Sequence, residues 1–197
     1  IMVDHNGTLV DGDQLLYLIM QFYIKEGITF GGVVGTHMTN LAFEEKCKMQ
    51  SIPFVRADVG DRYVSEELDR RKWILGGENS GHLLVKNLHS TGDGIISALQ
   101  VLSFLVKNKI SLKDALLDIK LYPQILINIP TENKVNLKSK VIRDAIKESE
   151  IIMKGMGRTL IRPSGTQPLV RVMTEGPVKN EVMKAAKFLT RTIEELI

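Results

Sequence analysis

Short apolar runs alternate with amphipathic stretches along the first two thirds of the chain. The runs have the length of buried strands, and the stretches between them repeat their apolar residues at helical spacing. This alternation is typical of an α/β domain whose mostly parallel sheet lies between helices. It predicts helices over residues 13–26, 40–50, 61–71 and 93–106, and strands over residues 31–36, 54–59, 73–75 and 82–85.

Polar residues mark the positions where these helices are expected to begin. Asp13 is predicted to cap the first helix, and Asn40 is predicted to cap the second. Either Thr91 or Asp93 begins the strongly apolar helix that follows the fourth strand, and Ser111 caps a shorter one. Each predicted helix therefore has a start signal of its own in the sequence.

The pattern changes near Tyr122. Beyond it the sequence predicts strands over residues 125–129, 151–154, 158–161 and 169–174. Residues 131–140 are predicted to form a polar loop that leads into a helix, and residues 178–196 a closing amphipathic helix. Strands that follow one another without crossover helices indicate an antiparallel sheet covered by helices. We therefore predict a mixed, mostly parallel α/β/α sandwich domain followed by a smaller α+β domain, with the boundary near residue 122.

Composition narrows the class of protein only in part. The chain has 197 residues, 44% hydrophobic and 25% charged residues, and a net charge of +3, which are ordinary values for a globular protein. Its single cysteine, Cys47, excludes an internal disulfide and favours a reducing, cytoplasmic location. No apolar stretch of the sequence is long enough to span a bilayer, so we expect no membrane partner. The opening residues read like the middle of a strand, which suggests a piece of a longer protein.

Residues 162–168 have the chemistry of a site for a dianionic phosphate. Arg162 offers a planar fork of donors, Ser164 and Thr166 add hydroxyl groups, and Gly165 allows the backbone to approach an anion closely. Arg171 follows nearby and adds a second guanidinium. A surface turn that holds an arginine by chance is the alternative interpretation.

A second polar cluster occupies residues 76–82. Glycines stand at both ends, and between them Glu78, Asn79, Ser80 and His82 supply both donors and acceptors. This mixture suits the hydroxyl groups and the amide of a sugar better than it suits a metal ion. The alternatives are a hairpin turn whose polar groups face water and, for His82 alone, a structural histidine.

The two polar clusters belong to a set of five short segments distributed along the chain. They are residues 3–14, 59–64, 77–82, 91–95 and 162–166. Together and in this order they resemble motifs of the α-D-phosphohexomutases, and the resemblance covers essentially the whole chain. Within that family, the sequence is most similar to the bacterial members that act on glucosamine phosphate.

The resemblance implies a four-domain isomerase that moves phosphate between the 6- and 1-positions of glucosamine, on the route to UDP-N-acetylglucosamine and peptidoglycan. The family uses a phosphoserine in its first domain and Mg²⁺ held by an aspartate-rich loop in its second. Neither motif occurs in this sequence, so the chain alone is expected to be inactive and no metal ligand is assigned. The segment that contains Asp11 and Asp13 could be mistaken for that loop, but it lacks the loop's third aspartate and its arginine.

The resemblance also implies a domain plan and a set of partners. Residues 1–9 would be the tail of the second domain, residues 10–121 the third domain, and residues 122–197 the fourth. The expected partners are a phosphosugar substrate and the missing N-terminal domains of the same protein, and a homodimer is left open. No catalytic residue is expected within this chain.

Roles for individual residues follow from the resemblance. It implies that Glu78 and Ser80 bind sugar hydroxyl groups and that Asn79 helps to read the amino group at C2. The resemblance assigns the distal phosphate to Arg162, Ser164, Gly165, Thr166 and Arg171. Arg62 and His82 are candidates for supporting the transferred phosphoryl group. Gln167 departs from the family pattern, which usually has Glu at this position.

Three alternatives remain open at this point. The chain could be a sugar-phosphate-binding module without chemistry, or a relative specialised for glucose or mannose phosphates. A nucleic-acid surface is a third possibility, because the isoelectric point is 8.9. Against it, aromatic residues make up only 6% of the sequence, and the lysines are interspersed with glutamates.

Overall fold

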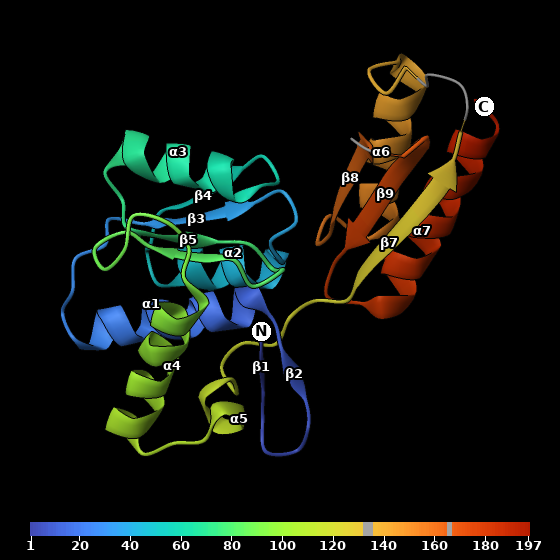
Figure 1. The fold of residues 1–197 in the computed structure, drawn as a ribbon. Coiled ribbons are helices and arrows are strands. Elements are labelled where there is room, and N and C mark those ends of the chain that lie inside the picture. The colour runs from blue at the N-terminus through green and yellow to red at the C-terminus, as the bar shows by residue number, and fades with distance from the viewer. Residues whose placement is uncertain (132–135, 165–166) are drawn as a thin grey trace. The chain divides into compact units, whose positions relative to one another are not determined.

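The computed structural model describes residues 1–131, 136–164 and 167–197. The chain divides into two compact units, Ile1–Leu121 and Tyr122–Ile197. Figure 1 shows the helices and strands of both units. Each unit builds its own sheet and its own apolar core, so each is described separately.

The first unit is built on a four-stranded sheet with the order β4-β3-β5-β6. Strand β3 (Val33–Thr36) runs parallel to both β4 (Phe54–Ala57) and β5 (Leu75–Gly77). Strand β6 (Leu83–Val85) pairs with β5 in the antiparallel direction, so these two strands form a hairpin. The predicted mixed, mostly parallel sheet is confirmed, and the antiparallel edge strand is its one departure from a fully parallel order.

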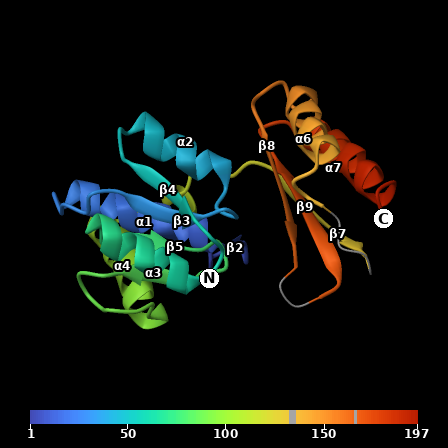
Figure 2. The same cartoon turned by 90° about the horizontal axis from the view of Figure 1, so that it is seen from above.

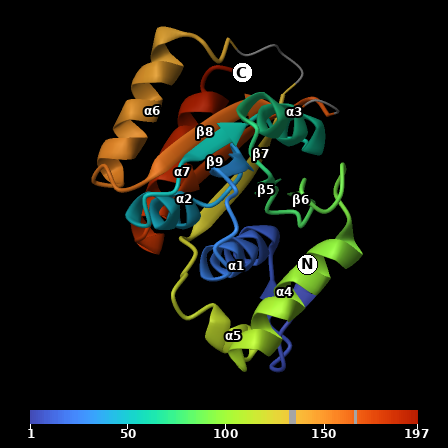
Figure 3. The same cartoon turned by 90° about the vertical axis from the view of Figure 1, so that its left-hand side faces the viewer.

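Helices cover both faces of this sheet. Helix α3 (Asp61–Arg71) packs on one face, while α1 (Gly12–Lys25) and α2 (Leu41–Met49) lie on the other (Figures 1 and 2). Helix α4 (Gly94–Asn108) lies beside α1, and the short α5 (Leu112–Ala115) follows it (Figure 3). Because α1 lies between the sheet and α4, it is buried on nearly every side. Its fully buried residues include Leu16, Leu18, Ile19 and Met20.

The starts of the helices test the sequence predictions directly. The predicted caps Asn40, Asp93 and Ser111 each accept a backbone N–H from the first turn of their helix, so these three predictions are confirmed. The prediction that Asp13 caps α1 is wrong. Asp11 is the cap, and it forms a reciprocal pair of hydrogen bonds with Gln14.

Asp13 has a different task. Its side chain is 1% exposed, and Oδ2 accepts the backbone N–H of Asn40 at 2.8 Å. The carboxylate therefore fixes the start of α2 against the first turn of α1. Sequence alone does not separate two aspartates that lie two residues apart, because the choice depends on a partner 27 residues away.

Asp11→Ala is expected to destabilise the chain by about 1 kcal/mol, the usual effect of removing a helix cap. The change leaves the N–H of Gln14 without its side-chain acceptor. Urea unfolding followed by circular dichroism measures the difference. Asp118→Ala is the matched control, since Asp118 is exposed and caps no helix; equal midpoints for the two variants would argue against the capping role.

A short hairpin precedes α1. Strands β1 (Met2–Val3) and β2 (Leu9–Val10) pair in the antiparallel direction. The turn is closed by Asp4, whose Oδ1 accepts the backbone N–H groups of Asn6 and Thr8. Two strands of this length are marginally stable by themselves, so the hairpin depends on contacts with its surroundings.

The second unit is a three-stranded antiparallel sheet with the order β7-β9-β8. Its strands are β7 (Gln124–Pro130), β8 (Arg158–Pro163) and β9 (Leu169–Glu175). Helices α6 (Lys140–Ile152) and α7 (Lys179–Glu194) cover one face of the sheet (Figure 2). The predicted α+β architecture with an antiparallel sheet is confirmed.

The predicted strand over residues 151–154 is wrong. Helix α6 continues to Ile152, and the chain then turns through Lys154 and Gly155, which have φ angles of 56° and 69°. The run of apolar residues suits a strand and the last turn of an amphipathic helix equally well. Packing decides between them, because Ile152 and Met153 join a core cluster with Val182 and Ala185 of α7.

Candidate functional site

The polar cluster of the first unit lies on the turn that joins β5 to β6. Glu78 donates its N–H to the carbonyl of His82 at 3.0 Å, and Gly81 donates to the carbonyl of Glu78 at 2.9 Å. The turn therefore has the hairpin geometry that was one of the sequence alternatives. It begins at the carboxyl end of β5, next to the parallel strand β3, where ligands of open α/β sheets commonly bind.

Glu78 does not simply face water. The backbone N–H of Gly60 donates to Glu78 Oε1 at 2.9 Å, and Gly60 is the residue that caps α3. A carboxylate is favourable at the amino end of a helix because unpaired N–H groups give that end a positive charge. Oε2 of Glu78 accepts no hydrogen bond from any described residue, so it is directed toward solvent or a ligand.

Helix α1 holds the same turn from the other side. The N–H of Gly12 donates to the carbonyl of Asn79 at 2.9 Å. A Cβ atom on Gly12 would lie 2.0 Å from the Glu78 carbonyl oxygen and 2.7 Å from the Gly81 nitrogen. Only glycine fits this close approach, and the turn is consequently held between Gly12, the first residue of α1, and Gly60, the N-cap of α3.

Two polar side chains of the turn, Asn79 and Ser80, have no hydrogen-bond partner among the described residues. Of the two, Ser80 is exposed. The backbone on both sides of them is fixed by the contacts of Glu78 and Gly81. The backbone that carries these two side chains is therefore held in place, and the side chains remain available to a ligand.

His82 lies at the edge of the same region. Its Nε2 is 3.6 Å from Asp61 Oδ2, at the first residue of α3, and its side chain is 41% exposed. The imidazole lies against Gly92, where a Cβ atom would come within 2.2 Å of Nε2. The predicted support residue His82 therefore lies beside the start of α3.

Arg62 points elsewhere. Its Nε donates to Glu66 Oε1 at 2.7 Å on the surface of α3, and its side chain is 80% exposed.

The sequence did not suggest a second polar pair, in which His37 Nε2 lies 3.4 Å from Asp58 Oδ1. His37 directly follows β3, and Asp58 directly follows Ala57, the last residue of β4. The predicted strand over residues 54–59 included Asp58, so the sequence did not identify it as a residue at the end of a strand.

In the second unit, Arg162 and Arg171 lie directly opposite each other on β8 and β9. Asn128 of β7 lies opposite Arg171 on its other side, so the three residues form one row across the sheet. The neighbours Val170 and Val172 pack into the core under the helices, which places the row on the opposite face. Two guanidinium groups opposite each other repel, so this row attracts an anion.

A second row, four residues along the same strands, shows the contrast. Arg158 on β8 lies opposite Glu175 on β9, and its guanidinium forms an ion pair with that fully buried carboxylate. Arg162 and Arg171 form no ion pair with any described residue. Arg171 Nε is buried and has no hydrogen-bond acceptor within the described residues.

The turn after β8 closes next to this row. Ser164 donates its N–H to the carbonyl of Leu169 at 2.9 Å, and Ser164 Oγ accepts the N–H of Gln167 at 3.3 Å. The predicted phosphate ligands Gly165 and Thr166 lie outside the described residues. The structure therefore brings Arg162, Arg171 and Ser164 together at one end of the sheet.

The described residues do not provide a metal site. No group of three or more His, Cys, Asp or Glu side chains lies close enough together to hold an ion within the described ranges. Asp11 and Asp13 are both engaged in backbone hydrogen bonds. Among the same residues, no helix combines the length and apolarity needed to cross a bilayer.

Comparison with family models decides the family. Residues 11–122 match the model for phosphoglucomutase/phosphomannomutase, alpha/beta/alpha domain III, and residues 126–191 match the C-terminal domain of the same family. The chain belongs to the phosphoglucomutase/phosphomannomutase family. Both polar turns lie inside the matched regions, one in each.

Curated relatives in this family are substantially longer than the chain. The chain is 47% identical over 197 residues to phosphoglucosamine mutase from Proteus mirabilis, covering 100% of the chain and 44% of that protein. It is 50% identical over 194 residues to phosphoglucosamine mutase from Ralstonia pickettii, covering 98% of the chain and 43% of that protein. The chain thus spans less than half the length of these phosphoglucomutase/phosphomannomutase relatives.

Solved structures confirm the fold. An N-acetylphosphoglucosamine mutase from Aspergillus fumigatus, in complex with GlcNAc-6P and magnesium, aligns with a TM-score of 0.80 at 19% identity. The alignment covers 99% of the chain and 46% of that protein. At this identity the likeness shows the fold alone.

Proposed function

We propose that the chain is the C-terminal part of a phosphoglucosamine mutase, an isomerase of amino-sugar metabolism that interconverts glucosamine 6-phosphate and glucosamine 1-phosphate. The reaction would pass through a phosphoserine and a bisphosphorylated sugar, both formed with the preceding domains of the longer protein. The similarity to named phosphoglucosamine mutases at 47–50% identity supports this substrate. The observation that carries the proposal is the unneutralised pair Arg162 and Arg171 beside a turn of hydrogen-bonding groups.

The second unit would hold the phosphate that is not being transferred. Arg162 and Arg171 supply positive charge from adjacent strands, and Ser164 with Gly165 and Thr166 would complete the grip from the turn. A bisphosphorylated intermediate must turn around before it returns its second phosphate. One fixed anion site that accepts either end of the sugar meets that requirement, because both ends carry the same charged group.

The first unit would bind the sugar itself. Glu78 and Ser80 would take hydroxyl groups, and Asn79 would read the substituent at C2. Hydrogen bonds to Gly12 and Gly60 hold this turn before the ligand arrives, which lowers the cost of ordering it. His82, which lies beside the start of α3, would support the transferred phosphoryl group. Arg62 would contribute only after it leaves its ion pair with Glu66.

Magnesium belongs to the preceding part of the protein in this proposal. The described residues of the chain offer no set of ligands that fits the ion, so no step is assigned to it here. Residues 1–9 would be the tail of the second domain, and residues 10–121 and 122–197 would be the third and fourth. The chain without the preceding domains would bind phosphosugars and catalyse no turnover.

An assay of the full-length protein tests the function. Glucosamine 6-phosphate, glucose 6-phosphate and mannose 6-phosphate are supplied in parallel, and the rate of appearance of each 1-phosphate is measured. The proposal expects the highest kcat/KM for glucosamine 6-phosphate. Preference for glucose or mannose phosphate would assign the protein to the other branch of the family, and binding without turnover would make it a non-catalytic module.

Asn79→Met is expected to shift the preference of the full-length enzyme from amino toward hydroxyl sugars. Methionine removes the amide that can hydrogen-bond to the C2 substituent and replaces it with a longer, apolar side chain. The measurement is the ratio of kcat/KM for glucosamine 6-phosphate to that for glucose 6-phosphate, with an expected drop of roughly tenfold. A constant ratio would show that Asn79 does not read C2.

A further inference from the structure

Helix α4 is apolar on two opposite faces. One face packs against the core of the first unit through Ser97, Val101 and Phe104, which are 6%, 1% and 4% exposed. Helices in a globular protein normally present a polar surface on the side away from the core. Helix α4 departs from this rule.

The outer face carries four large apolar side chains, which we call the α4 stripe: Ile95, Leu99, Leu102 and Val106. They are 74%, 53%, 43% and 75% exposed, respectively. Successive spacings of four, three and four residues place them on one line along the helix. A continuous apolar line of this length is typical of a surface that another part of a protein covers.

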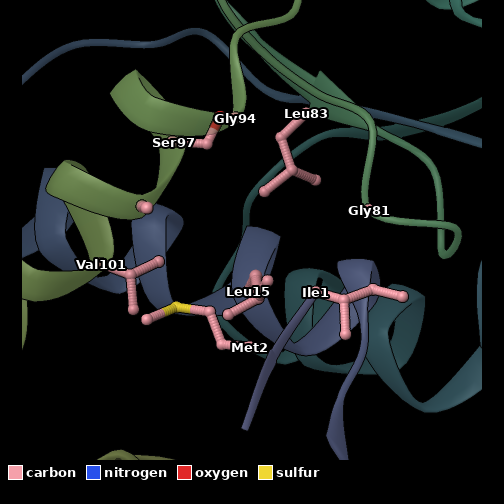
Figure 4. A pocket seen from close by; sticks show the side chains of 9 residues that line it. Ile1, Met2, Leu15, Gly81, Leu83, Gly94, Ser97 and Val101 are labelled. Atoms are coloured by element: carbon pink, nitrogen blue, oxygen red, sulfur yellow. The ribbon is translucent and has the colours of Figure 1, made fainter.

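The first residues of the chain lie against the same helix. Ile1 and Met2 face Gly94, Ser97 and Val101 across a small cavity of about 50 Å³ (Figure 4). The hairpin that begins there is also apolar on its exposed side. Its Ile1, Val3 and Leu9 are 63%, 61% and 58% exposed. Polypeptide that joins the chain at Ile1 therefore emerges beside the amino-terminal half of α4.

We propose that the α4 stripe is the docking surface for the part of the longer mutase that precedes residue 1. This inference rests on the proposed function, which makes the chain the C-terminal part of a longer enzyme. The chain covers 44% of its relatives, and its two matched regions are the third and the C-terminal domains of the family. The remaining length of such a protein is tethered at Ile1, which keeps its local concentration at α4 high.

Cysteine labelling tests this assignment with little background. The native Cys47 is fully buried, and burial raises the pKa of its thiol to about 12, so it reacts slowly with a maleimide in the folded protein. Leu99→Cys and Val106→Cys are each prepared in the full-length protein and in the 197-residue chain. Labelling is expected to be rapid in the chain and about tenfold slower or more in the full-length protein.

Met49→Cys is the matched control, since Met49 at the end of α2 is 76% exposed and should label equally fast in both proteins. Equal, rapid labelling of the α4 positions in both proteins would overturn the proposal. Slow labelling in both would also overturn it, and dependence of that protection on protein concentration would identify a second copy as the occupant. The readout requires no activity, so protection without mutase turnover would leave the docking surface standing while the proposed function fails.

Discussion

Arg162→Ala is expected to lower kcat/KM of the proposed full-length mutase by roughly 100-fold in both reaction directions, a loss of about 3 kcal/mol. The guanidinium lies opposite Arg171 and forms no ion pair with a described residue, so a phosphate that binds there meets two uncompensated positive charges. Removing one of them weakens the grip on either end of the sugar. Both directions should decline together, because in the proposed mechanism one site would hold the non-reacting phosphate each time.

Two companion variants sharpen that experiment. Arg162→Lys retains the charge and removes the planar fork, so an intermediate loss would separate charge from bidentate geometry. Arg143→Ala removes an exposed arginine from α6, far along the sequence from the turn, and is expected to leave kcat/KM unchanged. If Arg162→Ala behaves like Arg143→Ala, Arg162 takes no part in phosphate binding.

Gly12→Ala is expected to reduce kcat/KM by a comparable factor without touching the substrate. The added methyl group would lie 2.0 Å from the Glu78 carbonyl oxygen, which is too close for any two such atoms. The turn that carries Glu78, Asn79 and Ser80 must therefore move by about an ångström, and displacements of that size commonly cost about 100-fold in rate. Steady-state kinetics of the full-length enzyme measure the effect.

The chain provides a closely matched control for this substitution. Gly94 is the first residue of α4 just as Gly12 is the first residue of α1, and a Cβ atom on Gly94 meets nothing within 4 Å. Gly94→Ala should therefore leave the kinetics unchanged. Equal activity of the two variants would show that the position of the turn between β5 and β6 does not depend on α1.

Much of the fold was predictable because its signals are local. Caps at Asn40, Asp93 and Ser111 bond to residues two or three positions away, so the sequence contains both partners. The two errors have a common cause. Asp13 and the apolar run after residue 150 each satisfied two local rules, and a contact from a distant segment decided between them: the N–H of Asn40 in one case and the packing of Val182 in the other.

The candidate site divides in the same way. The sequence shows which residue types each turn contains, and a short hairpin places Arg162 and Arg171 near each other. The partners that fix the turn between β5 and β6 could not be predicted, because Gly12 and Gly60 bond to Asn79 and Glu78 from positions 18 or more residues away. The sequence signal at Gly12 was a glycine at the first position of a helix. That signal indicates a close backbone contact only when another segment packs against this end of the helix, which the sequence does not show.

Strands β8 and β9 carry one arginine row that is neutralised by Glu175 and one that is not. When no anion is present, the row of Arg162 and Arg171 works against the pairing of the strands that hold it. Saturation with inorganic phosphate or phosphosugar should accordingly raise the melting temperature of the protein, and Arg162→Ala should abolish most of that rise. The thermal stability of the protein would then depend on the concentration of phosphorylated ligands. The ligand-free protein would unfold more readily and be degraded faster by proteases.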